Sequence, residues 1–242
     1  MVEGLAKWSG SQNLVPDSPI RIEIKMNLFK SRVKKLIELK DYSGLKQLLS
    51  NDPELANKGI TIPFDFMCRV EAHPLHRICD PVFTGKITDG EAVTMAKIFL
   101  ENGAEIDGLK YEGTPLLAAA SLHAEQVGIL YINEGADVHY SYKNDGVTAL
   151  HWAAYCGLDK LVKRLIAANA EIDGLDKQHN SSPTGWAIHA LKSNDKVNRY
   201  NQLNCIKLLL KSGAEPQKLD KEKKDYLISL AEDDIDLQNS LT

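Results

Sequence analysis

Long hydrophobic runs are absent from this sequence of 242 residues. The longest mostly apolar stretch covers residues 116–120, with Leu122 beyond it, far short of the roughly 20 residues that a membrane-spanning helix needs. The opening segment, MVEGLAKW, contains no apolar segment of the length found in secretory signals. We therefore expect a cytoplasmic protein that does not act at a membrane, and the pattern leaves open its delivery to another cell.

The sequence also has few cysteines and no net positive charge. The four cysteines are scattered along the chain, which does not indicate a disulfide framework and favours a reducing compartment. The 33 acidic residues outnumber the 29 basic ones, so the formal net charge is -4 at pH 7. Because nucleic acids attract concentrated positive charge, no nucleic-acid partner is expected.

Catalytic and metal-binding motifs are missing as well. The chain has no Gly-x-Ser-x-Gly turn, no Gly-rich phosphate loop and no His-Glu-x-x-His sequence. One cluster has the residue types of metal ligands, at Cys68, His73, His76 and Cys79, but its spacing matches no common structural zinc site. We therefore expect no catalytic residues, no metal and no cofactor, and we expect that the protein is not an enzyme.

Internal repeats are the strongest feature that is present. The hexapeptide AEIDGL at 104–109 recurs unchanged at 170–175, 66 positions later. A related GADV stands between the two copies at 135–138, and GAEP at 213–216 closes the series. A second signature recurs in the other half of each unit, as HPLH at 73–76, TPLL at 114–117, TALH at 148–151 and SPTG at 182–185.

These two signatures resemble the ankyrin repeat, in which T-P-L-H-x-A begins a helix on a period of 33 residues. The resemblance covers about residues 41–217. It implies an all-α solenoid of stacked helix-turn-helix units with short β-hairpin tips. It also implies that the histidines at the signature position, His76 and His151, bond to backbone and brace neighbouring hairpins.

The residues at the helix ends agree with this fold. A hydroxyl residue that can cap a helix N-terminus stands at the start of three inner helices, at Thr114, Thr148 and Ser182. A residue that tolerates a left-handed backbone follows each outer helix, at Gly103, Gly135, Asn169 and Gly213.

The repeats and their flanks predict the domain organisation. We expect an N-terminal extension at 1–24 and an ankyrin-repeat domain at 25–242. The expected units are approximately 27–57, 70–109, 110–142, 143–175 and 176–217, with a C-terminal cap at 218–242. The spacing between signatures places insertions at 81–89 and 193–202, each between an inner and an outer helix.

The resemblance implies a protein-protein interaction module that binds one partner protein through the concave face of the array. Tyrosine is an efficient contact residue because it brings area and a hydrogen bond at low entropic cost. The candidate partner-binding residues lie at hairpin tips and inner-helix ends, at Tyr111, Glu112, Tyr140, Tyr142, Asn144, Asp145, Tyr155 and Lys177. We expect the unbound protein to be a monomer.

Phe64 and Phe66 lie in an enlarged finger at 58–72 and are further candidates for binding the partner. Their alternative role is to cover the end of the first unit, because large aromatic side chains are usually buried. Trp152 and Trp186 stand 34 positions apart in equivalent places. They are expected to stack in or beside the layer of inner helices, with a role as exposed anchors as the alternative.

Two alternative functions stay open at this point. The first is a stoichiometric inhibitor or immunity-type protein that blocks one enzyme or toxin. The second is an enzyme whose site is built by the insertions at 81–89 and 193–202, although these segments offer no nucleophile–base pair.

Overall fold

A computed structural model describes residues 32–61, 71–108, 113–142, 145–193 and 198–241. The expected N-terminal extension at 1–24 lies outside the described residues. A first helix covers residues 32–38. The later elements are α2 (Tyr42–Asn51), η1 (Pro53–Ala56), β1 (Ile60–Thr61), β2 (Glu71–Ala72), α3 (Pro74–Arg77), α4 (Asp80–Phe83), α5 (Asp89–Glu101), α6 (Pro115–Ser121), α7 (Glu125–Asn133), α8 (Ala149–Tyr155), α9 (Asp159–Ala167), α10 (Pro183–Ser193), α11 (Arg199–Lys211), η3 (Pro216–Lys218), α12 (Lys221–Glu232) and α13 (Ile235–Gln238).

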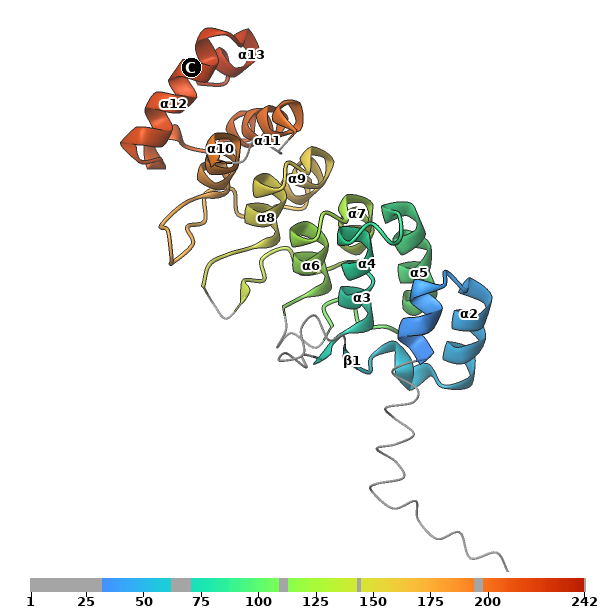
Figure 1. Ribbon diagram of the computed structural model, residues 1–242. Coiled ribbons are helices and arrows are strands. Elements are labelled where there is room, and N and C mark those ends of the chain that lie inside the picture. The colour runs from blue at the N-terminus through green and yellow to red at the C-terminus, as the bar shows by residue number, and fades with distance from the viewer. Residues whose placement is uncertain (1–31, 62–70, 109–112, 143–144, 194–197, 242) are drawn as a thin grey trace, which may run out of the picture.

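The helices stack in two layers along an elongated array (Figure 1). The inner layer contains α3, α6, α8 and α10, and the outer layer contains α2, α5, α7, α9 and α11. Each inner helix packs on the next, as α6 does on α8 and α8 on α10. The predicted all-α solenoid is confirmed, and the unit boundaries given above stay a prediction.

Strand structure in the described residues is limited to the base of the finger. There β1 and β2 pair in antiparallel fashion, with Ile60 opposite Ala72. The remainder of the finger, with Phe64 and Phe66, lies outside the described residues.

The helices begin and end with the capping and left-handed residues expected from the sequence. The hydroxyl of Thr114 accepts a hydrogen bond from the Leu117 N–H at 3.3 Å, and the hydroxyl of Ser182 accepts from the Gly185 N–H at 3.3 Å. These contacts satisfy N–H groups that the first helical turn leaves unpaired. Beyond the outer helices the backbone turns left-handed, with φ of +84° at Gly103, +90° at Gly135, +63° at Asn169 and +101° at Gly213.

The core runs continuously through the stacked units because small residues let the inner helices approach closely. Ala119, Ala120, Ala153 and Ala154 are fully buried between neighbouring units. Tyr131, on the outer helix α7, is also fully buried, and its hydroxyl donates to the Leu75 carbonyl of the preceding unit at 2.7 Å.

A ladder of side-chain hydrogen bonds joins the ends of successive units and explains the aspartate of the repeated hexapeptide. Asp107 accepts from the backbone N–H of Asp137 at 2.9 Å, and Asp173 accepts from the N–H of Glu215 at 3.1 Å. Asn57 makes the equivalent bond to Glu105 at 2.6 Å. At these three junctions a side chain of one unit therefore helps to fix the register of the unit that follows.

The insertion at 81–89 contacts both the preceding and the following unit. Lys86 pairs with Glu38 at 3.6 Å. Asp89 accepts hydrogen bonds from the backbone N–H groups of Gln126 and Val127 at the start of α7. The charged side chains of this insertion are thus engaged in contacts between units.

Candidate protein-binding groove

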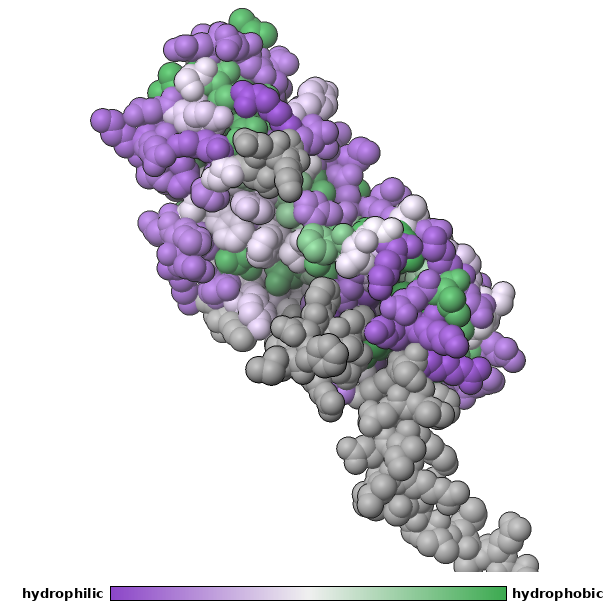
Figure 2. All heavy atoms as spheres, viewed as in Figure 1, coloured by the Kyte–Doolittle hydropathy of each residue, from purple (hydrophilic) through white to green (hydrophobic). Residues whose placement is uncertain are grey.

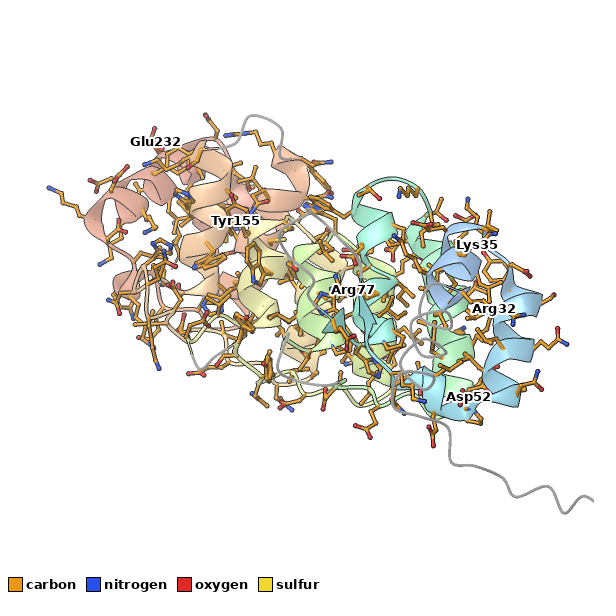
Figure 3. All side chains as sticks on the ribbon, turned by 60° about the horizontal axis from the view of Figure 1, so that its bottom comes forward. Arg32, Lys35, Asp52, Arg77, Tyr155 and Glu232 are labelled. Carbon is orange, nitrogen blue, oxygen red and sulfur yellow. The ribbon has the colours of Figure 1, made fainter. Side chains whose placement is uncertain are left out.

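Three aromatic side chains from two adjacent inner helices form an aromatic cluster. Trp152 and Tyr155 come from α8, and Trp186 comes from α10. The Trp152 and Trp186 ring centroids lie 5.3 Å apart, and Tyr155 lies 6.0 Å from Trp152 and 5.9 Å from Trp186. All three pairs meet edge to face, the arrangement that aromatic quadrupoles favour. Figure 3 shows Tyr155 where α8 meets α10, between the labelled ends of the array.

The repeat period brings this cluster together. Trp152 and Trp186 occupy equivalent positions of adjacent units, so the stacking of α8 on α10 places their rings side by side. Three residues after each tryptophan stands a second ring, Tyr155 or His189, on the same face of its helix. These two rings stack at 6.5 Å with an interplanar angle of 22°. The expected contact between the tryptophans is confirmed, and both side chains are half-buried beside the inner helices.

Asp176 holds the ring of Trp186 in place. The indole N–H of Trp186 donates to Asp176 Oδ2 at 2.9 Å, and the backbone N–H groups of His179 and Ser181 donate to the same carboxylate at 2.6 and 3.2 Å. Burial alone would raise the pKa of Asp176, but these hydrogen bonds outweigh it and lower the pKa below its ordinary value.

His151 supports the aromatic cluster through its hydrogen bonds to backbone groups and its contact with the Trp186 ring. Its Nε2 lies 3.1 Å from the Gly174 carbonyl oxygen, and its Nδ1 accepts from the Thr148 N–H at 3.2 Å. Its ring meets Trp186 edge to face at 5.5 Å. The expected bracing role is thus confirmed for His151. At His76, by contrast, Nδ1 is buried without a hydrogen-bond partner among the described residues.

Two hollows flank the aromatic cluster. The first, of about 360 Å³, is lined by the cluster, His179, His189 and Lys223 of α12. The second, of about 450 Å³, is lined by Trp152, Trp186, Ser121, Tyr142 and Asp145. The two hollows share both tryptophans and together form what we call the concave groove. Figure 2 shows pale and hydrophobic residues over α6 and α8 in the middle of the array.

The groove contains three of the candidate residues chosen from the sequence. Tyr142 and Asp145 line the second hollow, and Tyr155 lines the first. Tyr140 is half-buried, which raises its pKa. Lys177 is exposed, and its backbone N–H donates to the Asp145 carbonyl. The remaining candidates lie outside the described residues: Phe64, Phe66, Tyr111, Glu112 and Asn144.

The candidate partner-binding residues did not include Trp152, Trp186, His179 or His189. The 34-residue spacing did predict that the tryptophans meet, with a role as exposed anchors as the alternative, but the ring three residues after each tryptophan was not used. No comparable pattern marks His179, which reaches the groove through the turn organised by Asp176.

The described cysteines are poorly suited to act as nucleophiles. Burial raises the pKa of Cys156 to about 12 and also raises the pKa values of Cys79 and Cys205, so the thiolate form is suppressed at neutral pH. Within the ranges that the structure describes, no group of three or more His, Cys, Asp or Glu side chains is arranged to hold a metal. None of the described helices has the length and apolar composition to cross a membrane.

Comparison with known proteins agrees with the architecture. The family described as ankyrin repeats (3 copies) matches residues 87–180 and 123–220, which together span more than half of the chain. The chain therefore belongs to the ankyrin-repeat family. A solved structure, that of the human ASB11 ankyrin repeat domain, superimposes with a TM-score of 0.52 and 22% identity, covering 76% of this chain and 70% of that one. This likeness shows the shared fold.

Two curated relatives contain a similar segment within much longer chains. Human palmitoyltransferase ZDHHC13 is 34% identical over 120 residues, which is 46% of this chain and 18% of that protein. Rat palmitoyltransferase ZDHHC17 is 35% identical over 91 residues, which is 38% of this chain and 13% of that protein. The chain thus matches less than a fifth of the length of these relatives.

Proposed function

We propose that this protein binds a partner protein through the concave groove and performs no catalysis of its own. The observation that carries the proposal is the aromatic cluster of Trp152, Tyr155 and Trp186, half-buried between two hollows. Tryptophan and tyrosine are enriched among the residues that contribute most to binding energy at protein interfaces. The ankyrin-repeat family, in which stacked units create extended concave binding surfaces, supports the same reading.

The cluster is suited to binding because it is already ordered. Trp186 is fixed by its hydrogen bond to Asp176, and edge-to-face contacts fix Trp152 and Tyr155. A partner that packs on these rings therefore pays little additional side-chain entropy. Tyr142 and Asp145 extend the groove toward the preceding unit, and we include Tyr140, Lys177 and the candidates outside the described residues in the proposed contact surface.

The alternative of a catalytic site in the insertions receives no support from their described parts. Lys86 is paired with Glu38, and Asp89 caps α7. Both side chains therefore have structural roles, and the Cys79 thiol, whose pKa is raised by burial and by the charges of Asp80 and Asp89, is held in its unreactive protonated form.

The proposal is tested by comparing Tyr155→Ala/His189→Ala with Ile228→Ala in affinity capture from cells that make the protein. Ile228, on α12, is 58% exposed and does not line the concave groove, so its removal controls for the loss of an exposed hydrophobic side chain. We expect one stoichiometric partner with the wild type and Ile228→Ala, and binding weakened at least about tenfold in the double variant. Equal capture by all three folded proteins would refute the proposed groove.

The same partner distinguishes a simple interaction module from an inhibitor. If the partner is an enzyme or toxin, the wild-type protein is titrated into its activity assay. Loss of activity at a 1:1 ratio, with Tyr155→Ala/His189→Ala shifting the titration, assigns the inhibitor role. Unchanged activity of the bound partner assigns an adaptor role.

A further inference from the structure

A second hollow surface lies on the outer side of the array, away from the concave groove. Here α9 and α11 pack side by side, and four lysines line a depression of about 470 Å³ between them: Lys160 and Lys163 from α9, and Lys207 and Lys211 from α11. The spacings of three and four residues place each pair on one face of its helix. We call this depression the lysine groove.

The charge in the lysine groove is only partly neutralised. Lys163 and Lys211 are exposed and make no ion pair with any described residue. Lys160 lies 4.0 Å from Glu125, at the limit of an ion pair. Two aspartates also line the groove, Asp159, which accepts a hydrogen bond from Asn204 at 3.2 Å, and Asp236. The lining thus has four lysines and two aspartates, in a chain whose net charge is -4.

The C-terminal segment of the chain already places a carboxylate at one end of this groove. Lys207 Nζ lies 2.6 Å from Asp234 Oδ2, and these side chains are only 18% and 24% exposed. The hydrogen bond from Lys207 lowers the pKa of Asp234. Asp236, from the same short helix α13, also lines the depression. Lys207 is thus already paired with a carboxylate, whereas Lys163 and Lys211 make no ion pair with any described residue.

We infer that the lysine groove binds an acidic segment of a protein, whose Asp and Glu side chains pair with Lys160, Lys163 and Lys211. The contact between Lys207 and Asp234 shows the geometry of such a pair. A peptide is favoured over an anionic membrane because the lysines line a hollow between two helices, and Asp159 and Asp236 lie among them. Both aspartates would repel a continuous anionic surface, whereas a flexible peptide can avoid them. The site lies apart from the concave groove and does not depend on its function.

The test is fluorescence anisotropy with a fluorescein-labelled octaglutamate peptide at low salt. We expect saturable binding to the wild-type protein, weakened about tenfold or more by Lys163→Glu/Lys211→Glu and progressively weakened by added salt. The matched control, Lys97→Glu/Lys221→Glu, changes the net charge equally at exposed lysines outside the groove and is expected to bind within about twofold of wild type. Asp236→Asn removes a competing carboxylate and is expected to strengthen binding about two- to fivefold.

Three outcomes would overturn the inference. The first is peptide binding that does not saturate. The second is equal weakening of peptide binding by Lys163→Glu/Lys211→Glu and by the control double variant. Either result would indicate that the peptide responds to net charge alone. The third is a requirement for Lys163 and Lys211 in binding vesicles that contain phosphatidylserine, without peptide binding, which would assign the groove to membranes. Tyr155→Ala/His189→Ala is expected to leave peptide binding unchanged, which separates this site from the concave groove.

Discussion

Replacing Asp176 with asparagine tests whether the carboxylate holds the aromatic cluster together. Three N–H groups, including that of the Trp186 indole, point at this side chain, which is only 1% exposed. Asparagine keeps one acceptor oxygen but turns an NH₂ group toward one of the donors. Hydrogen bonds to a charged group contribute about 1.5–3 kcal/mol each, and an unsatisfied buried donor costs about 1–3 kcal/mol. We therefore expect Asp176→Asn to lower the free energy of unfolding by about 2–3 kcal/mol.

The measurement is urea-induced unfolding followed by tryptophan fluorescence. Asp225→Asn, at an exposed position of α12, is the control and is expected to change stability by less than about 0.5 kcal/mol. Because the pKa of Asp176 is lowered in the folded state, its contribution is present above the unfolded pKa, near 4, and is lost as the pH falls through the folded value. The difference between wild type and Asp176→Asn should therefore shrink below about pH 4. Equal stability of the two aspartate variants at pH 7 would refute this reasoning.

Three other predictions concern stability and thiol reactivity. Asn169 has a left-handed backbone with a φ of +63°. In thermal unfolding, Asn169→Gly should leave the free energy of unfolding unchanged or raise it by up to about 1 kcal/mol, whereas Asn169→Ala should lower it by about 1 kcal/mol. Tyr131→Phe removes the 2.7 Å hydrogen bond to the buried Leu75 carbonyl and leaves that carbonyl only the weak contact from the Cys79 thiol at 3.7 Å. The change should cost about 1–2 kcal/mol in urea unfolding, and an unchanged midpoint would contradict the assigned bond. Cys205 is fully buried and its pKa is raised, so thiol-labelling mass spectrometry should find it unmodified until the protein unfolds, and rapid native labelling would count against its burial.

Much of the fold could be predicted because residues that recur at the same position of different units make equivalent contacts there. The hexapeptide AEIDGL recurs because its aspartate bonds to the next unit, as Asp107 and Asp173 do. The left-handed positions after the outer helices were likewise predictable, because glycine and asparagine tolerate them best.

The site was less predictable, because it depends on contacts that a linear pattern does not encode. Tyr142, Asp145 and Tyr155 were candidates and line the groove, but the contact of Asp176 with Trp186 depends on the path of a hairpin tip. His76 Nδ1 lacks the partner that the Thr148 hydroxyl provides to His151 Nδ1 at 3.0 Å. The residue equivalent to Thr148 is His73, which has no hydroxyl and whose Nδ1 accepts from the Leu75 N–H.

The lysine groove could not be predicted from the sequence for a different reason. Its lysines are separated by the insertion between α10 and α11, so their juxtaposition depends on how α11 packs against α9. Four of the five residues at 232–236 are acidic, but the sequence does not show that Asp234 contacts Lys207.

Site-specific photo-crosslinking shows whether a partner protein contacts the aromatic cluster. The photoreactive residue p-benzoylphenylalanine is placed at position 155 in the concave groove or at position 228, an exposed position of α12 outside both grooves, and each protein is irradiated in cells that produce it. We expect one dominant crosslinked product from position 155 and none of that mass from position 228. A product from position 228 with none from position 155 would refute the proposed binding surface.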